Sequence, residues 1–128
     1  MPAVKIKWGF DFQIDASPRL TLNQPEIEVD SYDVTKVVLA AGAADTVEVQ
    51  PLGGDKVSFL VVSSDQYGDD LTYKVDADAT VYKLNAPHLF LGSGAIAFIG
   101  SNAPKKLAFT NGLPKAASLS VFAGRKRA

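Results

Sequence analysis

The chain has 128 residues and a mass of 13.6 kDa, is 47% hydrophobic, and contains one histidine and no cysteine. This length fits one folded domain, and the hydrophobic fraction is too high for a fully disordered chain. The lack of cysteine excludes disulfides, thiolate nucleophiles and iron–sulfur sites, and a single histidine excludes mechanisms that need two imidazoles. No apolar run is long enough to span a bilayer, and no apolar signal-peptide segment is apparent, so we expect no membrane contact.

The charges are distributed unevenly along the chain. All fourteen acidic residues lie at or before Asp78 together with six basic residues, which gives this part a formal balance of −8. From Ala79 onward there are seven basic residues and no acidic residue, a balance of +7. Such a separation indicates electrostatic contact with a partner or between copies of the chain. The alternative is chance, in a strand-rich sequence whose surface is filled by small residues.

Residues 4–14 show the longest alternation of apolar and polar side chains. Trp8, Phe10 and Phe12 fall on the apolar parity, and no helix would place this set on one face. The pattern predicts one half-buried strand, and we expect it to supply the largest aromatic part of the core. The Asp-Ala-Ser-Pro segment at 15–18 predicts where the strand ends.

Shorter strands are predicted at regular spacing along the rest of the chain. They cover residues 20–22, 27–29, 34–41, 46–50, 57–62, 71–75, 80–84, 106–110 and 117–123. The strand at 57–62 is apolar on both parities, which predicts a central strand covered on both faces or facing a partner. An apolar segment also lies at 89–91 and another at 95–99.

The connections carry recognisable turn residues. Small residues predict a loop at 40–44, Pro-Leu-Gly-Gly-Asp predicts a hairpin loop at 51–55, and residues 63–70 form the most polar loop. Gly92-Ser93-Gly94 and Gly100-Ser101 are interpreted as hairpin corners. Asn111-Gly112 predicts a hairpin between the last two strands, since both residues tolerate positive φ.

These elements predict an all-β protein, an antiparallel β-sandwich or jelly roll of about nine to ten short strands. No helix of three turns and no fixed-period repeat is apparent. We expect a single sandwich domain over residues 1–124, followed by a basic C-terminal tail at 125–128 that frays.

Five aspartates bracket the predicted strand at 71–75: Asp65, Asp69, Asp70, Asp76 and Asp78. Carboxylate oxygens suit Ca²⁺, so a calcium site is one interpretation of this group. The spacing is not that of an EF-hand and no glutamate offers a bidentate ligand, which favours a solvated acidic loop. Paired carboxylates can also serve a glycosidase, but nothing marks one of these as a buried acid. We therefore predict no metal and no cofactor.

The sequence shows no complete catalytic set. His88 would need a nucleophile and an orienting acid, and neither is identifiable, so a surface or interface histidine is the favoured interpretation. The Gly-Ser segments lack both the Gly-Lys-Ser/Thr ending of a phosphate loop and the Gly-x-Ser-x-Gly of a nucleophile elbow. We predict no catalytic residue and no enzyme, with a small hydrolase that depends on His88 as an alternative.

The basic residues of the C-terminal part predict a contact surface. Nucleic-acid binding would need a basic face that the acidic part does not offset, and the sequence pI of 5.7 argues against it. Contact with an acidic protein surface is the better interpretation. The predicted interface residues are Lys105, Lys106, Lys115, Arg125, Lys126 and Arg127, with Asp65, Asp69 and Asp70.

The four tyrosines suggest an alternative function. Tyr32, Tyr67, Tyr73 and Tyr82 would line a sugar-binding groove if they gathered on one face, and Tyr67 is the one we expect to be exposed. The alternative is therefore a carbohydrate-binding β-sandwich module, with or without a calcium-bound aspartate loop.

The composition of the last 90 residues supports a family resemblance. Leu-Ala-Ala-Gly-Ala-Ala-Asp at 39–45 precedes Thr-Val-Glu-Val, and a Gly- and Ala-rich part follows, with Leu-Ala-Phe-Thr-Asn-Gly at 107–112 and Ser-Leu-Ser-Val-Phe-Ala-Gly at 118–124. In this style, though in no single motif, the chain resembles small β-sandwich virion proteins of tailed bacteriophages, the head-decoration and auxiliary class. A tail or baseplate component is an alternative within the same resemblance.

The resemblance implies a non-enzymatic structural protein, made in the host cytoplasm and assembled in many copies on a virion shell. Its partners would be copies of itself and a major capsid or other virion protein, without a membrane and without direct contact to nucleic acid. The charge separation suggests how copies would meet: the acidic N-terminal and basic C-terminal segments would make complementary contacts between neighbours or with a capsid lattice.

Overall fold

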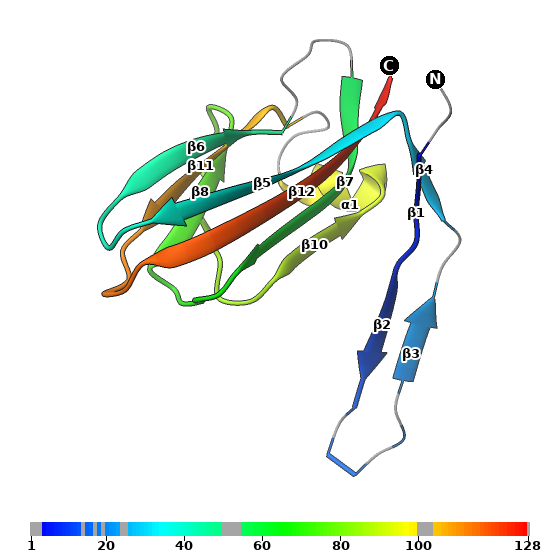
Figure 1. The fold of residues 1–128 in the computed structure, drawn as a ribbon, viewed down its shortest axis with the longest axis horizontal. Helices are drawn as coiled ribbons and strands as arrows, with labels where there is room; N and C mark the ends of the chain where they lie inside the picture. The colour runs from blue at the N-terminus through cyan, green and yellow to red at the C-terminus, as the bar shows by residue number, and fades with distance from the viewer. Residues whose placement is uncertain are drawn as a thin grey trace.

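The chain forms two antiparallel four-stranded sheets packed face to face, with a two-stranded arm that projects from one end (Figure 1). The structure is a computed structural model, and it describes residues 4–13, 15–16, 18, 20–23, 26–49, 55–99 and 104–127. The predicted all-β antiparallel sandwich is confirmed.

The two layers differ in strand length. Sheet I has the spatial order β10 (His88–Leu91), β7 (Asp55–Ser64), β12 (Ala117–Arg127) and β5 (Ser31–Leu39). Sheet II has the order β6 (Ala44–Glu48), β11 (Lys106–Asn111), β8 (Leu71–Val75) and β9 (Tyr82–Lys83). Among the described strands of these sheets, only β8 and β9 pair with a sequence neighbour, so nearly every connection crosses between layers.

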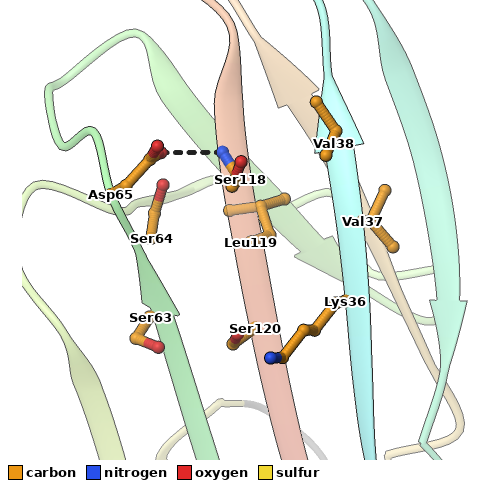
Figure 2. A pocket seen from close by; sticks show the side chains of 9 residues that line it. All are labelled: Lys36, Val37, Val38, Ser63, Ser64, Asp65, Ser118, Leu119 and Ser120. Atoms are coloured by element: carbon orange, nitrogen blue, oxygen red, sulfur yellow. Dashed lines mark hydrogen bonds between the residues drawn. The ribbon is translucent and has the colours of Figure 1, made fainter.

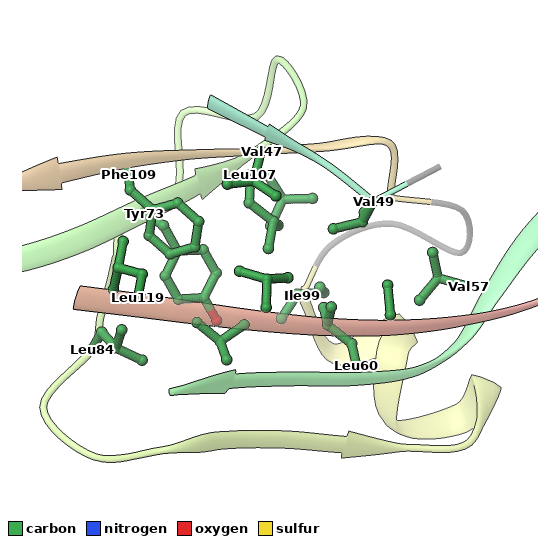
Figure 3. Close-up of a cluster of buried hydrophobic side chains, with 14 of the residues drawn as sticks. Val47, Val49, Val57, Leu60, Tyr73, Leu84, Ile99, Leu107, Phe109 and Leu119 are labelled. Carbon is green, nitrogen blue, oxygen red and sulfur yellow. The ribbon is translucent and has the colours of Figure 1, made fainter. Parts of the chain in front are cut away.

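The core lies between the sheets and is built largely by alternate residues of the strands, although residues 57–60 of β7 are all buried. In β12 the buried residues alternate with exposed or half-buried ones, and Leu119 and Val121 point inward. From sheet II, Tyr73, Leu107 and Phe109 face them (Figure 3). The prediction that the strand at 57–62 is central is confirmed, since β7 lies between β10 and β12.

One end of the core is closed by a short helical segment rather than by strand. The apolar residues at 95–99 lie in α1 (Ser93–Ile96) and the 3-10 turn η1 (Ala97–Ile99), which bury Ile96 and Ile99. Gly92 does turn the chain, at φ +97°, but Gly94 lies within α1, so its interpretation as a hairpin corner is wrong. Gly100 and Ser101 lie outside the described residues.

The predicted C-terminal tail is instead the end of a central strand. β12 continues to Arg127 because β5 pairs with it as far as Arg125 and β7 as far as Arg127. Arg125 is buried and donates to the Val49 carbonyl oxygen at 2.8 Å and to Asp33 Oδ2 at 3.1 Å. The predicted division at 124/125 therefore coincides with no end of secondary structure.

The strand predicted at 4–14 divides into two short strands that lie outside the sandwich core. β1 (Val4–Ile6) pairs with β4 (Ile27–Val29), and β2 (Gly9–Phe12) pairs with β3 (Leu20–Asn23). Together they form a two-stranded arm whose outer half extends away from both sheets (Figure 1). The expectation that Trp8, Phe10 and Phe12 fill the core is wrong.

The hairpin predicted at Asn111-Gly112 is also wrong, because β11 and β12 belong to different sheets. Neither residue has a positive φ. Glycine at position 112 instead lets the chain pass close to the backbone of Asp70, because a Cβ there would lie 2.9 Å from the Asp70 carbonyl oxygen. Residues 51–54 of the other predicted hairpin loop lie outside the described residues, and the strands on either side of it are likewise in different sheets.

Asn111 holds two inter-sheet connections together. Its side chain is fully buried, and Nδ2 donates to the carbonyl oxygens of Leu39 at 2.9 Å, Lys115 at 2.9 Å and Ala40 at 3.3 Å. Its Oδ1 accepts from the Leu113 backbone N–H at 3.0 Å. One amide group thus satisfies backbone groups of the β5–β6 and β11–β12 turns.

Replacing Asn111 by Ala should destabilise the protein by about 2–4 kcal/mol, because buried carbonyl and N–H groups lose their partner without gaining water. Chemical denaturation measures this free energy of unfolding. Asn85→Ala is the matched control: Asn85 is exposed and makes one side-chain bond, to Asp69, so a change within about 0.5 kcal/mol is expected. Equal losses in both variants would contradict the role given to Asn111.

Candidate functional site

The arm has one apolar and one polar face. The rings of Trp8 and Phe10 lie 5.4 Å apart and those of Phe10 and Phe12 6.3 Å apart, so the three form a ladder along one side of the arm. Phe12 is 49% exposed, and the Trp8 indole N–H has no acceptor among the described residues. An aromatic ladder of this kind on a projecting ribbon is a surface suited to contact.

Charged residues occupy the opposite face of the arm. Glu26 lies 3.9 Å from the Lys5 ammonium and 3.6 Å from that of Lys7, and the Thr21 hydroxyl donates to Asp11 at 2.7 Å. These exposed ion pairs add little stability. They do show that Lys5 and Lys7 share a face, which leaves the aromatic ladder on the other one.

The base of the arm is anchored on the outer face of sheet I. The Asp30 backbone N–H donates to the Arg125 carbonyl at 2.7 Å. A Cβ at Gly124 would lie 2.9 Å from Val29 Cγ1 and 3.1 Å from Ile6 Cδ1, so glycine lets the arm approach the strand closely. Val29 is buried by this contact although it lies outside the sandwich core.

Sheet I presents an apolar outer face as well as an apolar inner one. Register partners across an antiparallel sheet share a face. One row therefore crosses all four strands as Leu89, Val61, Phe122 and Val34, and the next as Leu91, Phe59, Gly124 and Tyr32. Phe122 stacks on Tyr32 at 5.8 Å and meets Phe59 edge-on at 5.2 Å.

The other half of this outer face is a hollow of about 450 Å³ that is lined by both apolar and polar side chains (Figure 2). Ser63, Ser118 and Ser120 line it with Lys36, and Val38 lies at its rim. Asp65 is already engaged, since its Oδ1 accepts from the Ser118 backbone N–H at 2.8 Å. The hollow offers hydroxyl donors and acceptors beside the apolar rows.

The structure does not bring His88 to these serines. His88 pairs in register with the inward-facing Val62, whereas Ser63, Ser118 and Ser120 lie on the outer face. His88 Nδ1 lies 2.7 Å from the hydroxyl of the buried Tyr73. These three serines therefore do not lie on the same face of the sheet as His88.

The electrostatics of this pair follow from burial. Burial raises the pKa of the Tyr73 hydroxyl well above its ordinary value, with a smaller contribution from Tyr82, so the hydroxyl stays protonated in its hydrogen bond with His88. Burial lowers the pKa of His88 below 6.5, although a hydrogen bond with the Lys83 backbone opposes this. The pair ties β8 of sheet II to β10 of sheet I.

The predicted acidic residues are used separately. Asp65 binds the Ser118 backbone, Asp69 accepts from the Asn85 amide at 3.0 Å, and Asp76 Oδ1 accepts from the Lys105 and Lys106 backbone N–H groups at 2.9 Å. Within the described part of the chain, no group of three His, Asp or Glu side chains is placed to hold a metal ion. The acidic loop thus gives no geometric support to the calcium alternative.

The predicted basic interface residues do not form one group either. Lys105, Lys106 and Lys115 are exposed at sheet II and the connection after it, whereas Lys126 is exposed on sheet I beside Lys56. Arg125 is buried, so its assignment to an exposed interface is wrong. The side chain of Arg127 lies outside what the structure describes.

The tyrosines are likewise dispersed. Tyr67 is 37% exposed, as expected, but its hydroxyl accepts from the Ser64 backbone N–H at 3.0 Å. Tyr73 and Tyr82 stack at 5.5 Å on the core side of the sandwich. Tyr32 is the most exposed of the four and lies on the outer face of sheet I. They line no common groove.

Comparison with known proteins identifies no relative. No family model, no curated protein and no solved structure matches this chain. No helix among the described residues has the length and apolar character needed to cross a membrane. The outer face and the arm therefore have to be interpreted from their own chemistry.

The sequence indicated the outer face of sheet I only as an alternative, in which one face of the strand at 57–62 meets a partner, and it did not identify the arm as a surface. The apolar residues on both parities of 34–39 and 57–62 indicate strands with apolar side chains on two faces. In the arm, the alternation itself was recognised, but it does not say which surface covers the apolar side.

The His88–Tyr73 pair predicts a specific loss of stability in acid. The unfolded chain takes up a proton near pH 6.5 and the folded chain only at lower pH, so stability is complete above pH 6.5 and decreases as the pH falls below it. Between about pH 7 and pH 5 the wild-type Tm should fall by a few degrees more than the Tm of His88→Gln. Glutamine can keep a hydrogen bond with the Tyr73 hydroxyl but does not titrate in this range. Parallel thermal-melting profiles for the two proteins would contradict the assignment.

Proposed function

We propose that this protein is a non-enzymatic structural component of a virion, which decorates or cements a capsid or similar shell through contacts between many copies. The observation that carries the proposal is the projecting arm, whose outer half extends away from both sheets and leaves Phe12, at the end of the aromatic ladder, 49% exposed. An exposed aromatic side chain on a projecting ribbon that lies outside the core is suited to contact with another molecule.

The outer face of sheet I supports the same proposal. Its two apolar rows include Val34, which is 48% exposed, and Leu89, which is 41% exposed. A sheet face that meets only water usually carries polar side chains at such positions. A molecule with two separate apolar surfaces, one projecting and one flat, is equipped for repeated contacts of one surface with the other.

Association of the purified protein tests this proposal. Light scattering over a range of concentrations should give masses that rise above 13.6 kDa in multiples of the chain, and electron microscopy should show regular particles or arrays. The association should persist in high salt, because the two surfaces are mainly apolar and salt screens charge contacts rather than apolar ones.

A mass of 13.6 kDa at every concentration, with and without salt, would contradict the proposal. Disordered aggregates that show no regular repeat by electron microscopy would contradict it as well. An activity lost in a His88 variant that folds normally would favour the hydrolase alternative instead.

A further inference from the structure

The arm and the outer face of sheet I already contact one another once within the chain. At the base of the arm, Ile6 and Val29 lie against Gly124, next to the buried Phe59 of the second apolar row. Both surfaces continue beyond this contact. The apolar side of the arm continues through Trp8, Phe10 and Phe12, and the apolar face of the sheet continues through Phe122 toward its edges.

The arm cannot cover the rest of its own sheet, because its outer half points away from the sandwich (Figure 1). The uncovered parts nevertheless match in size. From Trp8 to Phe12 the strand spans about 13 Å, and the width of a four-stranded sheet from first to last strand is about 14 Å. The aromatic ladder is thus long enough to cross the apolar rows of such a face.

Charge favours the same pairing. Exposed lysines flank the apolar rows: Lys36 at one end and Lys56 with Lys126 at the other. Among the described residues of the outer half of the arm, Asp11 and Asp15 are acidic and none is basic.

We propose that the occupant of this face is a second copy of the chain, whose arm lays its aromatic ladder across the apolar rows of the outer face of sheet I. This inference rests on the proposed function and names its contact surfaces. Each copy has one arm and one face. Two copies can therefore exchange arms as a reciprocal dimer, or successive copies can bind arm to face until they close a ring. Within one chain, Ile6 and Val29 pack the base of the arm against this face. The proposed contact repeats that kind of packing between two copies.

Cysteine cross-linking tests the contact directly, because the chain has no cysteine of its own. One copy carries Phe12→Cys, and a second, isotope-labelled copy carries Val34→Cys or Leu89→Cys, at opposite edges of the same apolar row. Mild oxidation of the mixture should give a mixed disulfide that mass spectrometry identifies by its label. No single-cysteine chain can form this product alone.

Two controls make the result specific. Asp11→Cys places the thiol beside Phe12 but on the polar face of the arm, and Lys74→Cys places it on the exposed side of β8 in sheet II. Phe12 would lie near one edge of the face, so the mixed disulfide of Phe12→Cys with one of the two face variants should exceed the control pairs severalfold. Equal yields for all pairs would overturn the inference.

Association of point variants gives an independent measurement. Phe12→Ser should weaken self-association about tenfold or more, since a phenyl group no longer transfers from water to the interface, whereas Asp11→Ser should change it by less than about threefold. Val34→Asp should weaken it as Phe12→Ser does. Both altered side chains are exposed in the chain itself, and an unchanged Tm confirms that each variant folds.

The double variant decides whether the two positions belong to one contact. If they do, the free energy of association lost by the double variant Phe12→Ser, Val34→Asp is smaller than the sum of the losses in the two single variants. A double-variant loss equal to that sum would overturn the inference. A wild type that assembles normally while none of the variants weakens it also overturns the inference, and the proposed function stands. A wild type that stays a single chain at all concentrations overturns both.

Discussion

The position of β12 between β5 and β7 is the constraint on which the rest of the structure depends. Its inward residues, among them Leu119 and Val121, complete one side of the core, and its outward residue Phe122 forms the centre of the outer aromatic cluster. At its end, Gly124 admits the base of the arm and Arg125 reaches back to Val49. Core, outer face and arm anchor therefore all meet on one strand.

The same arrangement explains the separation of charge along the sequence. The basic C-terminal part supplies β11 and β12, and each lies between strands of the acidic part, β6 and β8 in one sheet and β5 and β7 in the other. Asp33 contacts Arg125, and Asp76 accepts from two backbone N–H groups of the basic part. Charges that are distant in sequence thus become neighbours within one molecule. The separation along the sequence does not by itself require a partner.

The sequence allowed the fold class and most strands to be predicted, because alternation is a local property of each segment. The strand predicted at 71–75 coincides with β8, and the strands at 57–62 and 106–110 lie within β7 and β11. Pairing is not local in this way. Asn111-Gly112 has the composition of a hairpin turn, but the Asn111 amide binds carbonyl groups of two connections, and the chain crosses to the other sheet. Local preference was outweighed by buried hydrogen bonds that only the complete fold provides.

The candidate surfaces were harder to predict for a related reason. An alternating strand shows that one of its sides is apolar, but the same pattern results whether that side covers a core, a neighbouring molecule or nothing. Trp8, Phe10 and Phe12 were therefore assigned to the core, the commonest location for aromatic residues. Likewise, the buried position of Arg125 depends on acceptors at Val49 and Asp33 that lie far away in sequence.

The arm gains less stability from its own contacts than the sandwich does. A two-stranded ribbon is marginally stable in water, and this one gains little from its exposed ion pairs. Its ring contacts stabilise the ladder only partly, because a large part of Phe12 remains in water. Covering the ladder would therefore stabilise the arm and the contact together, so the ordering of the arm and the binding of a neighbour would reinforce each other. The sandwich, whose core is complete without the arm, would change little in the process.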